Sequence, residues 1–427
     1  IHLQKMKLQK ILSNFQKLHP KEIDLSLDRI KNLCAKLGNP QDEIKCIQVC
    51  GTNGKGSTIS FLHSILKEAN IKSNIYTSPH VKTINERFVY NDEIISDDAL
   101  FELLNEVENI NNGEPLTYFE ALTAAFFYGC RKYKENIVLA EFGLFGRGDA
   151  VNILKKNLCN IVTSISEDHL DWLPENERNI ERIIFEKTSS LLDSNIIVSK
   201  QSSTEITECI KKNILNNKAN KYFFNEDYNF ILKENDFFYY KDKFGGLKIL
   251  KPGMNGQFQL ENASTAIAAL RVLENSKIKD EQIISGVKKA YNLGRLEEIK
   301  SGKLKNLLKN NTLIVDSSHN PGGSKALNRY LQTLNCKKHV IVGMMENKDH
   351  EKFLSYFKNI SSLTVVDIPN QINAISGMKL KEKLKNVSNL NYKESIEKAI
   401  KSLRLEKNDI VLITGSIYLA GEVLKLN

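Results

Sequence analysis

The chain has 427 residues, of which 41% are hydrophobic and 26% are charged. This length exceeds the size at which single hydrophobic cores stop growing, so we expect a globular protein of two domains. Lys and Arg number 60 against 51 Asp and Glu, which gives a net charge of +9. Because aromatic residues do not interleave with the basic ones, the composition argues against a nucleic-acid partner and favours a solvated, Lys-rich exterior.

The location of the protein is limited by two further features. No apolar run approaches the roughly 18 residues of a transmembrane helix, and the first residues lack the pattern of a secretory signal. The seven cysteines are scattered, odd in number and without C-x-x-C spacing. This usage is typical of reduced thiols, so we expect a cytoplasmic protein without membrane segments, zinc or disulfides.

The first predicted elements lead to a glycine-rich loop. Residues 3–18 and 25–37 are predicted helices, joined by a connector that contains Ile23-Asp24-Leu25. Residues 44–49 form a short apolar run that predicts a buried strand. Residues 57–70 carry apolar side chains on one helical face. Between the strand and this helix lies Cys-Gly-Thr-Asn-Gly-Lys-Gly-Ser, at residues 50–57.

This order of strand, glycine-rich turn, lysine, hydroxyl and helix is typical of a phosphate-binding loop. Its glycines let backbone N–H groups point at one anion, and the helix N-terminus adds its dipole. Lys55 would reach the outer phosphates, and Ser57 lies where a hydroxyl can support a magnesium ion. The alternative is a turn that binds nothing, but strand, lysine and helix in register favour a nucleoside triphosphate.

Further strands are predicted at residues 73–77, 136–140 and 159–165, with helices at 97–110 and 118–134. This alternation indicates a doubly wound, mostly parallel sheet, whose ligands collect at the carboxyl ends of the strands. Ser78, Glu141 and His169 follow such strands. A carboxylate and a hydroxyl suit magnesium, although Glu141 alone could be a solvated strand end. Imidazole suits magnesium less well, so a lone His169 would more often be structural.

The rest of the chain predicts an antiparallel addition at about residues 220–250, a helix at 257–273 and a second α/β pattern. The strands of that pattern are expected at 313–316, 340–343, 363–367 and 409–413. We therefore predict an ATP-binding domain with a substrate pocket at residues 1–293. A smaller Rossmann-like α/β domain is predicted at 294–427, of ordinary domain size.

In their order along the chain, the motifs resemble the folylpolyglutamate synthase and dihydrofolate synthase family, a branch of the Mur-type ATP-dependent amide ligases. The similarity covers nearly the whole chain. Each motif alone is weak, but the ordered set is specific. The matching segments are residues 51–57, 76–80, 85–87, 116–120, 166–169, 172–173, 185–187, 294–297, 316, 319–321, 348–349 and 414–416.

The resemblance implies a role for each matching residue. Lys55, His169, Lys187 and Arg295 would be catalytic. Ser78, Glu141 and His169 would bind magnesium, and a carbamylated Lys187 would help to bind a second magnesium. The nucleotide would be bound by Thr52, Asn53, Gly54, Lys55, Gly56, Ser57, Asn262, Arg295 and Asp316. The pterin pocket would be lined by Ile23, Asp24, Leu25, Leu116, Thr117, Tyr118, Phe119, Gly148, Asp149 and Ala150.

The implied reaction is activation of a carboxylate by ATP to an acyl phosphate, which the amine of L-glutamate then attacks. Dihydropteroate and folates would be the acceptors, and we expect a monomer. The alternatives are a folylpolyglutamate synthase only, a Mur-type ligase for another carboxylate such as a cell-wall precursor, and a nucleotide switch without catalysis. The pterin-side matches argue against the cell-wall ligase, and the second domain with Arg295 and Asp316 argues against the switch.

The sequence departs from the family pattern at a few positions. Phe145 stands where the family has a glycine, and Thr188-Ser189-Ser190 and Ser317-Ser318 replace smaller or apolar residues. Lys187 could also be a surface lysine that pairs with Glu186, since such pairs are common and contribute little. Asp24 could likewise cap the following helix rather than bind a ligand.

Overall fold

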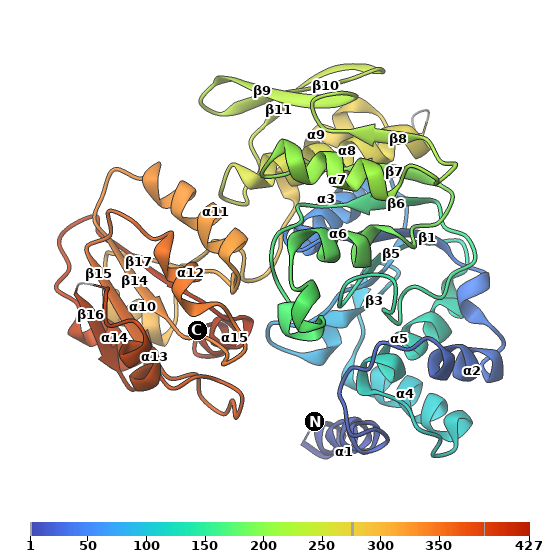
Figure 1. Cartoon of the computed structure of the whole chain (residues 1–427), viewed down its shortest axis with the longest axis horizontal. Helices are drawn as coiled ribbons and strands as arrows, with labels where there is room; N and C mark the ends of the chain where they lie inside the picture. Colours follow the sequence, from blue (N-terminus) through green and yellow to red (C-terminus); the bar gives the residue numbers. More distant parts are fainter. Residues whose placement is uncertain (1, 275–276, 388) are drawn as a thin grey trace. The chain divides into compact units, whose positions relative to one another are not determined.

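The computed structural model describes residues 2–274, 277–387 and 389–427, which divide into two compact units (Figure 1). The first unit comprises the residues up to 165 together with 179–251 and 260–290. The second comprises residues 291–427 together with the segments 166–178 and 252–259. A single division near residue 293 therefore does not describe these two segments, which belong with the C-terminal part of the chain.

An eight-stranded sheet forms the centre of the first unit, in the order β4-β3-β2-β5-β1-β6-β7-β8. It is parallel from β2 to β8, and β3 and β4 add an antiparallel edge. Its central strands are buried except for Lys45 at the start of β1, as expected for apolar runs covered on both faces. The strands are β1 (Lys45–Cys50), β2 (Ser73–Tyr76), β3 (Phe88–Tyr90), β4 (Glu93–Ile94), β5 (Ile137–Glu141), β6 (Cys159–Val162), β7 (Asn195–Val198) and β8 (Lys221–Phe223).

Helices alternate with these strands, and α1, α2, α4 and α5 gather beside the β3 side of the sheet (Figure 1). The helix α5 begins with a capping box, in which Thr117 and Glu120 each accept the other's backbone N–H. The helices are α1 (His2–Lys17), α2 (Asp28–Lys36), α3 (Lys55–Glu68), α4 (Asp97–Asn111), α5 (Tyr118–Gly129), α6 (Ile180–Thr188), α7 (Thr204–Asn213), α8 (Phe258–Glu274) and α9 (Asp280–Lys289).

The helix that follows the phosphate loop, α3, packs closely against α9. A Cβ atom added to Gly286 would lie 2.5 Å from the Cα of Ile65, so only glycine fits at this crossing. Ser64 also donates a hydrogen bond to the carbonyl oxygen of Gly286 at 2.6 Å. The two helices are therefore joined by both packing and a hydrogen bond.

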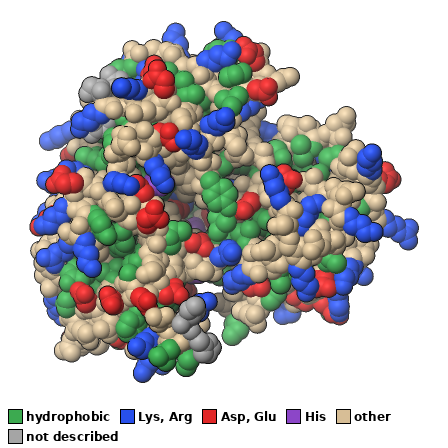
Figure 2. Space-filling model, turned by 180° about the vertical axis from the view of Figure 1, so that it is seen from behind, with side chains coloured by type: hydrophobic (Ala, Val, Ile, Leu, Met, Phe, Trp, Pro, Cys, Tyr) green, Lys and Arg blue, Asp and Glu red, His purple; other side chains and the backbone are tan. Residues whose placement is uncertain are grey.

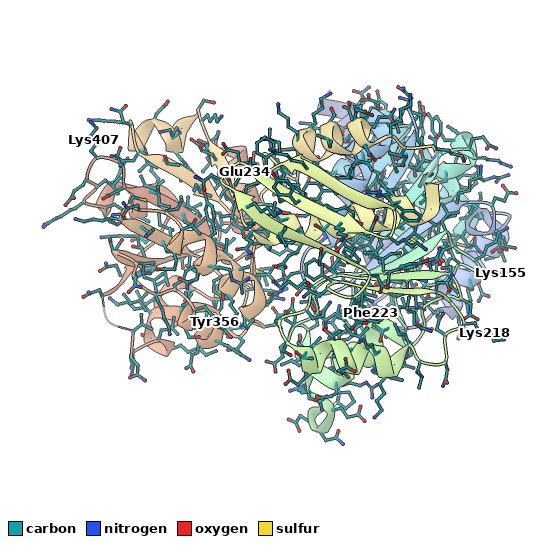
Figure 3. The ribbon with its side chains drawn as sticks, turned by 90° about the horizontal axis from the view of Figure 1, so that it is seen from above. Lys155, Lys218, Phe223, Glu234, Tyr356 and Lys407 are labelled. Carbon is teal, nitrogen blue, oxygen red and sulfur yellow. The ribbon has the colours of Figure 1, made fainter. Side chains whose placement is uncertain are left out.

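The predicted antiparallel addition is a three-stranded sheet of β9 (Tyr228–Glu234), β10 (Phe237–Asp242) and β11 (Gly245–Leu250). Figure 3 looks onto this sheet and labels Glu234 at the end of β9. Phe238 and Tyr240 are buried on one face, and α9 packs against β11. This confirms the predicted antiparallel addition for residues 228–250, whereas residues 221–223 form β8 of the large sheet.

The second unit contains a six-stranded sheet in the order β12-β13-β17-β14-β15-β16, which is parallel except for β12. Its strands are β12 (Glu297–Ile299), β13 (Thr312–Val315), β14 (Lys338–Val342), β15 (Ser362–Val366), β16 (Leu390–Lys393) and β17 (Ile410–Thr414). Its helices are α10 (Lys303–Leu308), α11 (Pro321–Gln332), α12 (His350–Ser355), α13 (Gly377–Lys383), α14 (Ile396–Ser402) and α15 (Ile417–Lys425). The predicted fold class, two α/β units of which the first has a doubly wound, mostly parallel sheet, is confirmed.

The surface and the helices agree with the composition. Lys and Arg side chains are scattered over the face shown in Figure 2, with Asp and Glu side chains between them. The seven cysteines are free thiols, and five of them are buried. Among the described residues, every helix is too short or too polar to span a bilayer.

Candidate active site

The predicted phosphate loop connects β1 to α3 in the first unit. Its helix begins at Lys55, two residues earlier than predicted, so Lys55, Gly56 and Ser57 form the first turn. Backbone N–H groups of a first turn have no partner within the helix and are suited to bind an anion. The N–H groups of Thr52 and Asn53 instead donate to the carbonyl oxygen of Ser164, at 2.9 and 3.1 Å.

Two glycines of the loop are required by their surroundings. Gly51 has a φ of 140°, and a Cβ there would lie 1.9 Å from the hydroxyl of Thr163. Gly54 has a φ of 89°, and a Cβ there would lie 2.5 Å from Oδ1 of Asn262. Since L side chains rarely adopt such φ values, both positions favour glycine. The second contact also brings Asn262, a predicted nucleotide-binding residue, next to the loop.

A hydroxyl and a carboxylate lie together at the carboxyl end of the sheet. Glu141 is the last residue of β5, and its Oε2 accepts a hydrogen bond from the backbone N–H of Ser78 at 3.3 Å. Nζ of Lys55 lies 4.0 Å from Oε1 of Glu141 and donates to the carbonyl oxygen of Gly51 at 3.0 Å. The predicted loop lysine and the predicted metal-binding carboxylate are therefore neighbours.

The side chain of Ser78 fits the predicted role in metal binding. Its Oγ is buried and has no hydrogen-bond partner among the described residues. Burying an unpaired hydroxyl is costly, so a ligand that uses this oxygen would remove that cost. The described residues hold no group of three or more His, Cys, Asp or Glu side chains suited to a metal. A hard cation here would therefore also need hydroxyl, phosphate or water oxygens, which magnesium commonly uses.

Lys187 lies at the end of α6 and is buried, with 4% of its surface exposed. Its Nζ donates to the carbonyl oxygen of Gly51 at 2.9 Å and lies 5.6 Å from the ring centre of Phe145. Glu186 instead pairs with Arg147 and Arg182. The alternative of a surface lysine paired with Glu186 is therefore wrong, because the two side chains point into different surroundings.

Phe145 adopts a left-handed conformation with a φ of 58° and is buried. This conformation costs a non-glycine residue about 1–2 kcal/mol, which explains why a glycine would suit the position. The ring is accommodated beneath Lys187, and the neighbouring Gly146 packs against the backbone of Lys187. The conformation of the loop of residues 143–149 therefore depends on its packing against α6.

The predicted residues of the second unit form two groups. Asp316 follows β13 and accepts the backbone N–H groups of Leu296 and Ser318 at 2.9 and 2.8 Å. It thereby anchors the turn that carries Arg295. The assignment of Arg295 and Asp316 to a nucleotide stays a prediction.

The other group surrounds Asp168, which precedes His169. Its carboxylate lies 3.0 Å from Nζ of Lys348, 3.4 Å from Nε2 of His319 and 3.7 Å from Nε2 of His169. Burial alone would raise the pKa of Asp168, but these neighbours outweigh it and hold the pKa well below its usual value. Asp168 therefore fixes the segment 166–178, with His169, to the second unit.

The three predicted substrate segments meet within the first unit. A Cβ added to Gly148 would lie 2.9 Å from the Cβ of Leu25, which brings the connector against the 148–150 segment. A Cβ added to Gly143 would lie 2.6 Å from the ring of Phe119. Asp149 links these parts, since Gly143 and Leu144 donate their N–H groups to its Oδ2 at 2.9 and 2.6 Å.

Asp149 is buried in this arrangement, and burial raises its pKa to about 6 although backbone N–H groups of Leu144, Val151 and Gly143 act in the opposite direction. At neutral pH the carboxyl is therefore mostly ionised and remains a hydrogen-bond acceptor.

Asp24 is also engaged, by side chains. Its Oδ2 lies 3.1 Å from Nη1 of Arg29 and 3.7 Å from Nε2 of His19, and its side chain is 32% exposed. Arg29 also binds Glu120, which is buried at the start of α5. Arg29 was not among the residues predicted from the sequence, and Glu120 was named only as part of the matching segment 116–120. The Thr-x-x-Glu pattern at residues 117–120 was the one available signal for Glu120, as a capping box.

A separate cavity of about 560 Å³ lies between β3, β4, α4 and the end of α5. Its lining includes Tyr90, Tyr128, Tyr133 and Arg131, and none of the predicted site residues. It therefore lies apart from the phosphate loop.

Comparison with known proteins gives matches over most of the chain. Residues 49–270 match the Mur ligase middle domain, and residues 294–417 match the glutamate ligase domain of Mur ligases. A dihydrofolate synthase/folylpolyglutamate synthase of Bacillus subtilis is 30% identical and covers 93% of this chain and 94% of its own. The dihydrofolate synthase/folylpolyglutamate synthase of Escherichia coli is 28% identical, and the match covers 97% of this chain and 94% of that protein.

Solved structures agree. FolC of Escherichia coli in complex with DHPP and ADP has a TM-score of 0.86 at 28% identity, covering 98% of this chain and 97% of its own. The bifunctional folylpolyglutamate synthase/dihydrofolate synthase of Yersinia pestis, complexed with AMPPNP and a manganese ion, has a TM-score of 0.85 at 26% identity. The match covers 98% of this chain and 97% of that chain. With the motif order, the two-unit fold and these matches in agreement, the chain belongs to the dihydrofolate synthase/folylpolyglutamate synthase branch of the Mur ligase family.

Proposed function

We propose that the protein joins L-glutamate to dihydropteroate and to the γ-carboxyl group of folates, at the expense of ATP. Two groups of residues in the first unit carry this proposal. A phosphate loop lies beside Glu141 and Lys187, and the connector, the start of α5 and the 148–150 segment come together as a second group. The first group suits a triphosphate, and the second suits a flat, polar ring.

The reaction begins when the acceptor carboxylate attacks the γ-phosphate of ATP, which gives an acyl phosphate and ADP. The amine of L-glutamate then attacks the acyl carbon, an amide forms and phosphate leaves. Such transfer depends mainly on positioning and on charge stabilisation. Lys55 supplies positive charge to the phosphates, and the N–H groups of the first turn of α3 orient them. In this proposal Arg295 supplies further charge and Asp316 and Asn262 complete the nucleotide site.

Magnesium fits the residues present, since Ser78 offers a buried, unpartnered hydroxyl and Glu141 a carboxylate. In this proposal Ser78, Glu141 and His169 hold one ion, and Lys187 as a carbamate helps to hold a second. When bound, the ions neutralise charge on the phosphate oxygens.

In this proposal the acceptor is recognised by the connector, the start of α5 and the 148–150 segment. Phe119 and Leu25 provide apolar surface, and Asp149 and Asp24 accept hydrogen bonds from amino and N–H groups of a pterin ring. We also propose that residues 1–293, apart from the segments 166–178 and 252–259, act as the ATP- and folate-binding part and that 294–427 act as the C-terminal ligase part. In this proposal the protein acts as a monomer in the cytoplasm, and the seven free thiols support the reducing compartment.

The test measures ADP release by the purified chain with ATP, magnesium, L-glutamate and either dihydropteroate or tetrahydrofolate. We expect continuous release with both acceptors, none when the acceptor is omitted, and no more than one equivalent per enzyme when glutamate is omitted. Lys55→Ala should abolish release, whereas Lys67→Ala, on an exposed position of the same helix, should not.

Each rival gives a different result. ADP release that ignores the acceptor indicates a nucleotide switch, and release with tetrahydrofolate alone indicates a folylpolyglutamate synthase only. No release with either acceptor would mean that the enzyme acts on another carboxylate.

A further inference from the structure

We propose that Arg29 is a positioning residue that sets the spacing of the pterin pocket and thereby the ability to use dihydropteroate. This inference rests on the proposed function and deepens it. It concerns a residue that touches none of the reacting groups but binds two of the segments that line the pocket.

The first contact of Arg29 is with the start of α5. Its Nη2 and Nε reach the carboxylate of Glu120 at distances of 2.7 to 3.1 Å, which is a two-pronged ion pair. Glu120 is 2% exposed and also accepts the backbone N–H of Thr117. A bidentate pair on a buried carboxylate fixes orientation as well as distance. Arg29 therefore fixes the turn that carries Thr117, Tyr118 and Phe119.

The second contact is with the connector. Nη1 of Arg29 lies 3.1 Å from Oδ2 of Asp24, and Nη2 donates to the backbone carbonyl oxygen of Asp24 at 3.1 Å. Both the side chain and the main chain of Asp24 are thus tied to the same guanidinium. A lysine could not replace these contacts, because a point charge lacks the planar set of donors.

Together these contacts join the connector to the start of α5, although Arg29 and Glu120 are 91 positions apart in the sequence. Leu25 of the connector packs on Gly148, so the spacing set by Arg29 extends to the third lining segment. A flat ring held between such segments is sensitive to their separation, since a misplacement of about 1 Å can cost a hundredfold in rate.

The same pair of helices offers a matched control at its other end. Arg131 follows α5 and donates from Nη1 to the carbonyl oxygen of Leu37, which follows α2, at 3.2 Å. Its guanidinium also lies over the ring of Tyr128 at 5.4 Å. α2 and α5 therefore run parallel, with Arg29 joining their first turns and Arg131 joining their ends away from the lining segments.

The experiment compares Arg29→Lys with Arg131→Lys and the wild-type chain. The KM for dihydropteroate, the KM for ATP and kcat are measured with each, together with the thermal midpoint. For Arg29→Lys we expect a rise of about tenfold to a hundredfold in the KM for dihydropteroate, with the KM for ATP unchanged. Arg131→Lys should leave both KM values unchanged.

A second variant covers the case in which Arg29→Lys does not fold. Glu120→Gln retains the capping box, since glutamine also suits this position, but loses the ion pair. It should raise the KM for dihydropteroate in the same way. The double variant should be no worse than Arg29→Lys alone, because Glu120→Gln removes a contact that Arg29→Lys has already removed.

The outcomes distinguish a failure of the inference about Arg29 from a failure of the proposed function. If the wild-type chain uses dihydropteroate and both variants retain its KM, the inference about Arg29 is wrong and the proposed function stands. An equal rise in the KM for ATP, or an equal effect of Arg131→Lys, would show a general structural role and overturn the inference. If the wild-type chain does not use dihydropteroate, the bifunctional part of the proposed function fails, and this inference fails with it.

Discussion

The side-chain nitrogen of Lys187 donates a hydrogen bond to the backbone carbonyl oxygen of Gly51 at 2.9 Å, although the two residues are 136 positions apart in the sequence. The side chain that we propose as the carrier of a carbamate thus contacts the first glycine of the phosphate loop. A carbamate would keep one N–H on Nζ, which can still donate to Gly51, and would add two anionic oxygens that accept hydrogen bonds or bind a cation. Modification is therefore compatible with the contact between Nζ of Lys187 and Gly51.

This relationship leads to the first prediction. Lys187→Ala should be inactive because it removes the group that would carry the carbamate, and a small carboxylate such as acetate should restore part of the activity. Lys155→Ala, at an exposed lysine of the same unit that pairs with Asp42, serves as the control and should retain activity. An intact mass that shows an unmodified amine in the active, bicarbonate-treated enzyme would contradict the carbamate.

Glu141→Gln should retain the fold and lower kcat by about a hundredfold, because a neutral amide binds magnesium poorly and the ion contributes several kcal/mol of charge stabilisation. The control is Glu135→Gln, an exposed residue just before the opposite end of β5. The measurement is turnover as a function of magnesium concentration. A Glu141→Gln variant that keeps more than half of the wild-type turnover at limiting magnesium would show that Glu141 is not a ligand.

Asp24→Ala should depress the use of dihydropteroate far more than the elongation of tetrahydrofolate, since an unpaired pterin donor costs about 1–3 kcal/mol. The measurement is the ratio of the two kcat/KM values in the variant and in the wild-type chain. Lys21→Ala is the matched control, because Lys21 is exposed and its ion pair with Asp24 is long, at 3.5 Å. An unchanged ratio for Asp24→Ala would mean that this carboxylate does not read the pterin ring.

Asp168→Asn should destabilise the second unit by about 3 kcal/mol at neutral pH, because it leaves the mostly buried Lys348 without its carboxylate. The pKa of Asp168 is held well below its usual value, so its contribution is present above about pH 4 and is lost as the pH falls further. The difference in unfolding free energy between wild type and variant should therefore shrink towards pH 3. A difference that stays constant from pH 7 to pH 3 would show that Asp168 gains no stability from its charge.

Much of the fold was predictable because its signals are local. The run before Gly51 and the run before Glu141 are apolar enough to read as buried strands, and both are. Boundaries were less accurate. The strand expected at 159–165 ends at Val162, because the backbone of Ser164 turns to accept the N–H groups of Thr52 and Asn53.

The parts of the site that could not be predicted depend on long-range contacts. Nothing near Asp168 in the sequence indicates that Lys348 holds it, and the segment 166–178 joins the second unit through this and similar contacts. Arg29 likewise has no local pattern, because its partner Glu120 lies on another helix. Such residues become visible only when the chain is folded.

The close crossing of α3 and α9 has a mechanical consequence. Because Gly286 leaves no space between the two helices and Ser64 is bonded to its carbonyl oxygen, α3 cannot shift without carrying α9. A nucleotide that stiffens the loop at the start of α3 should therefore also suppress the local opening of α9, although none of the predicted nucleotide-binding residues lies on α9. Amide hydrogen exchange across residues 280–289 should slow when ADP binds, so that α9 reports at a distance on the occupancy of the loop.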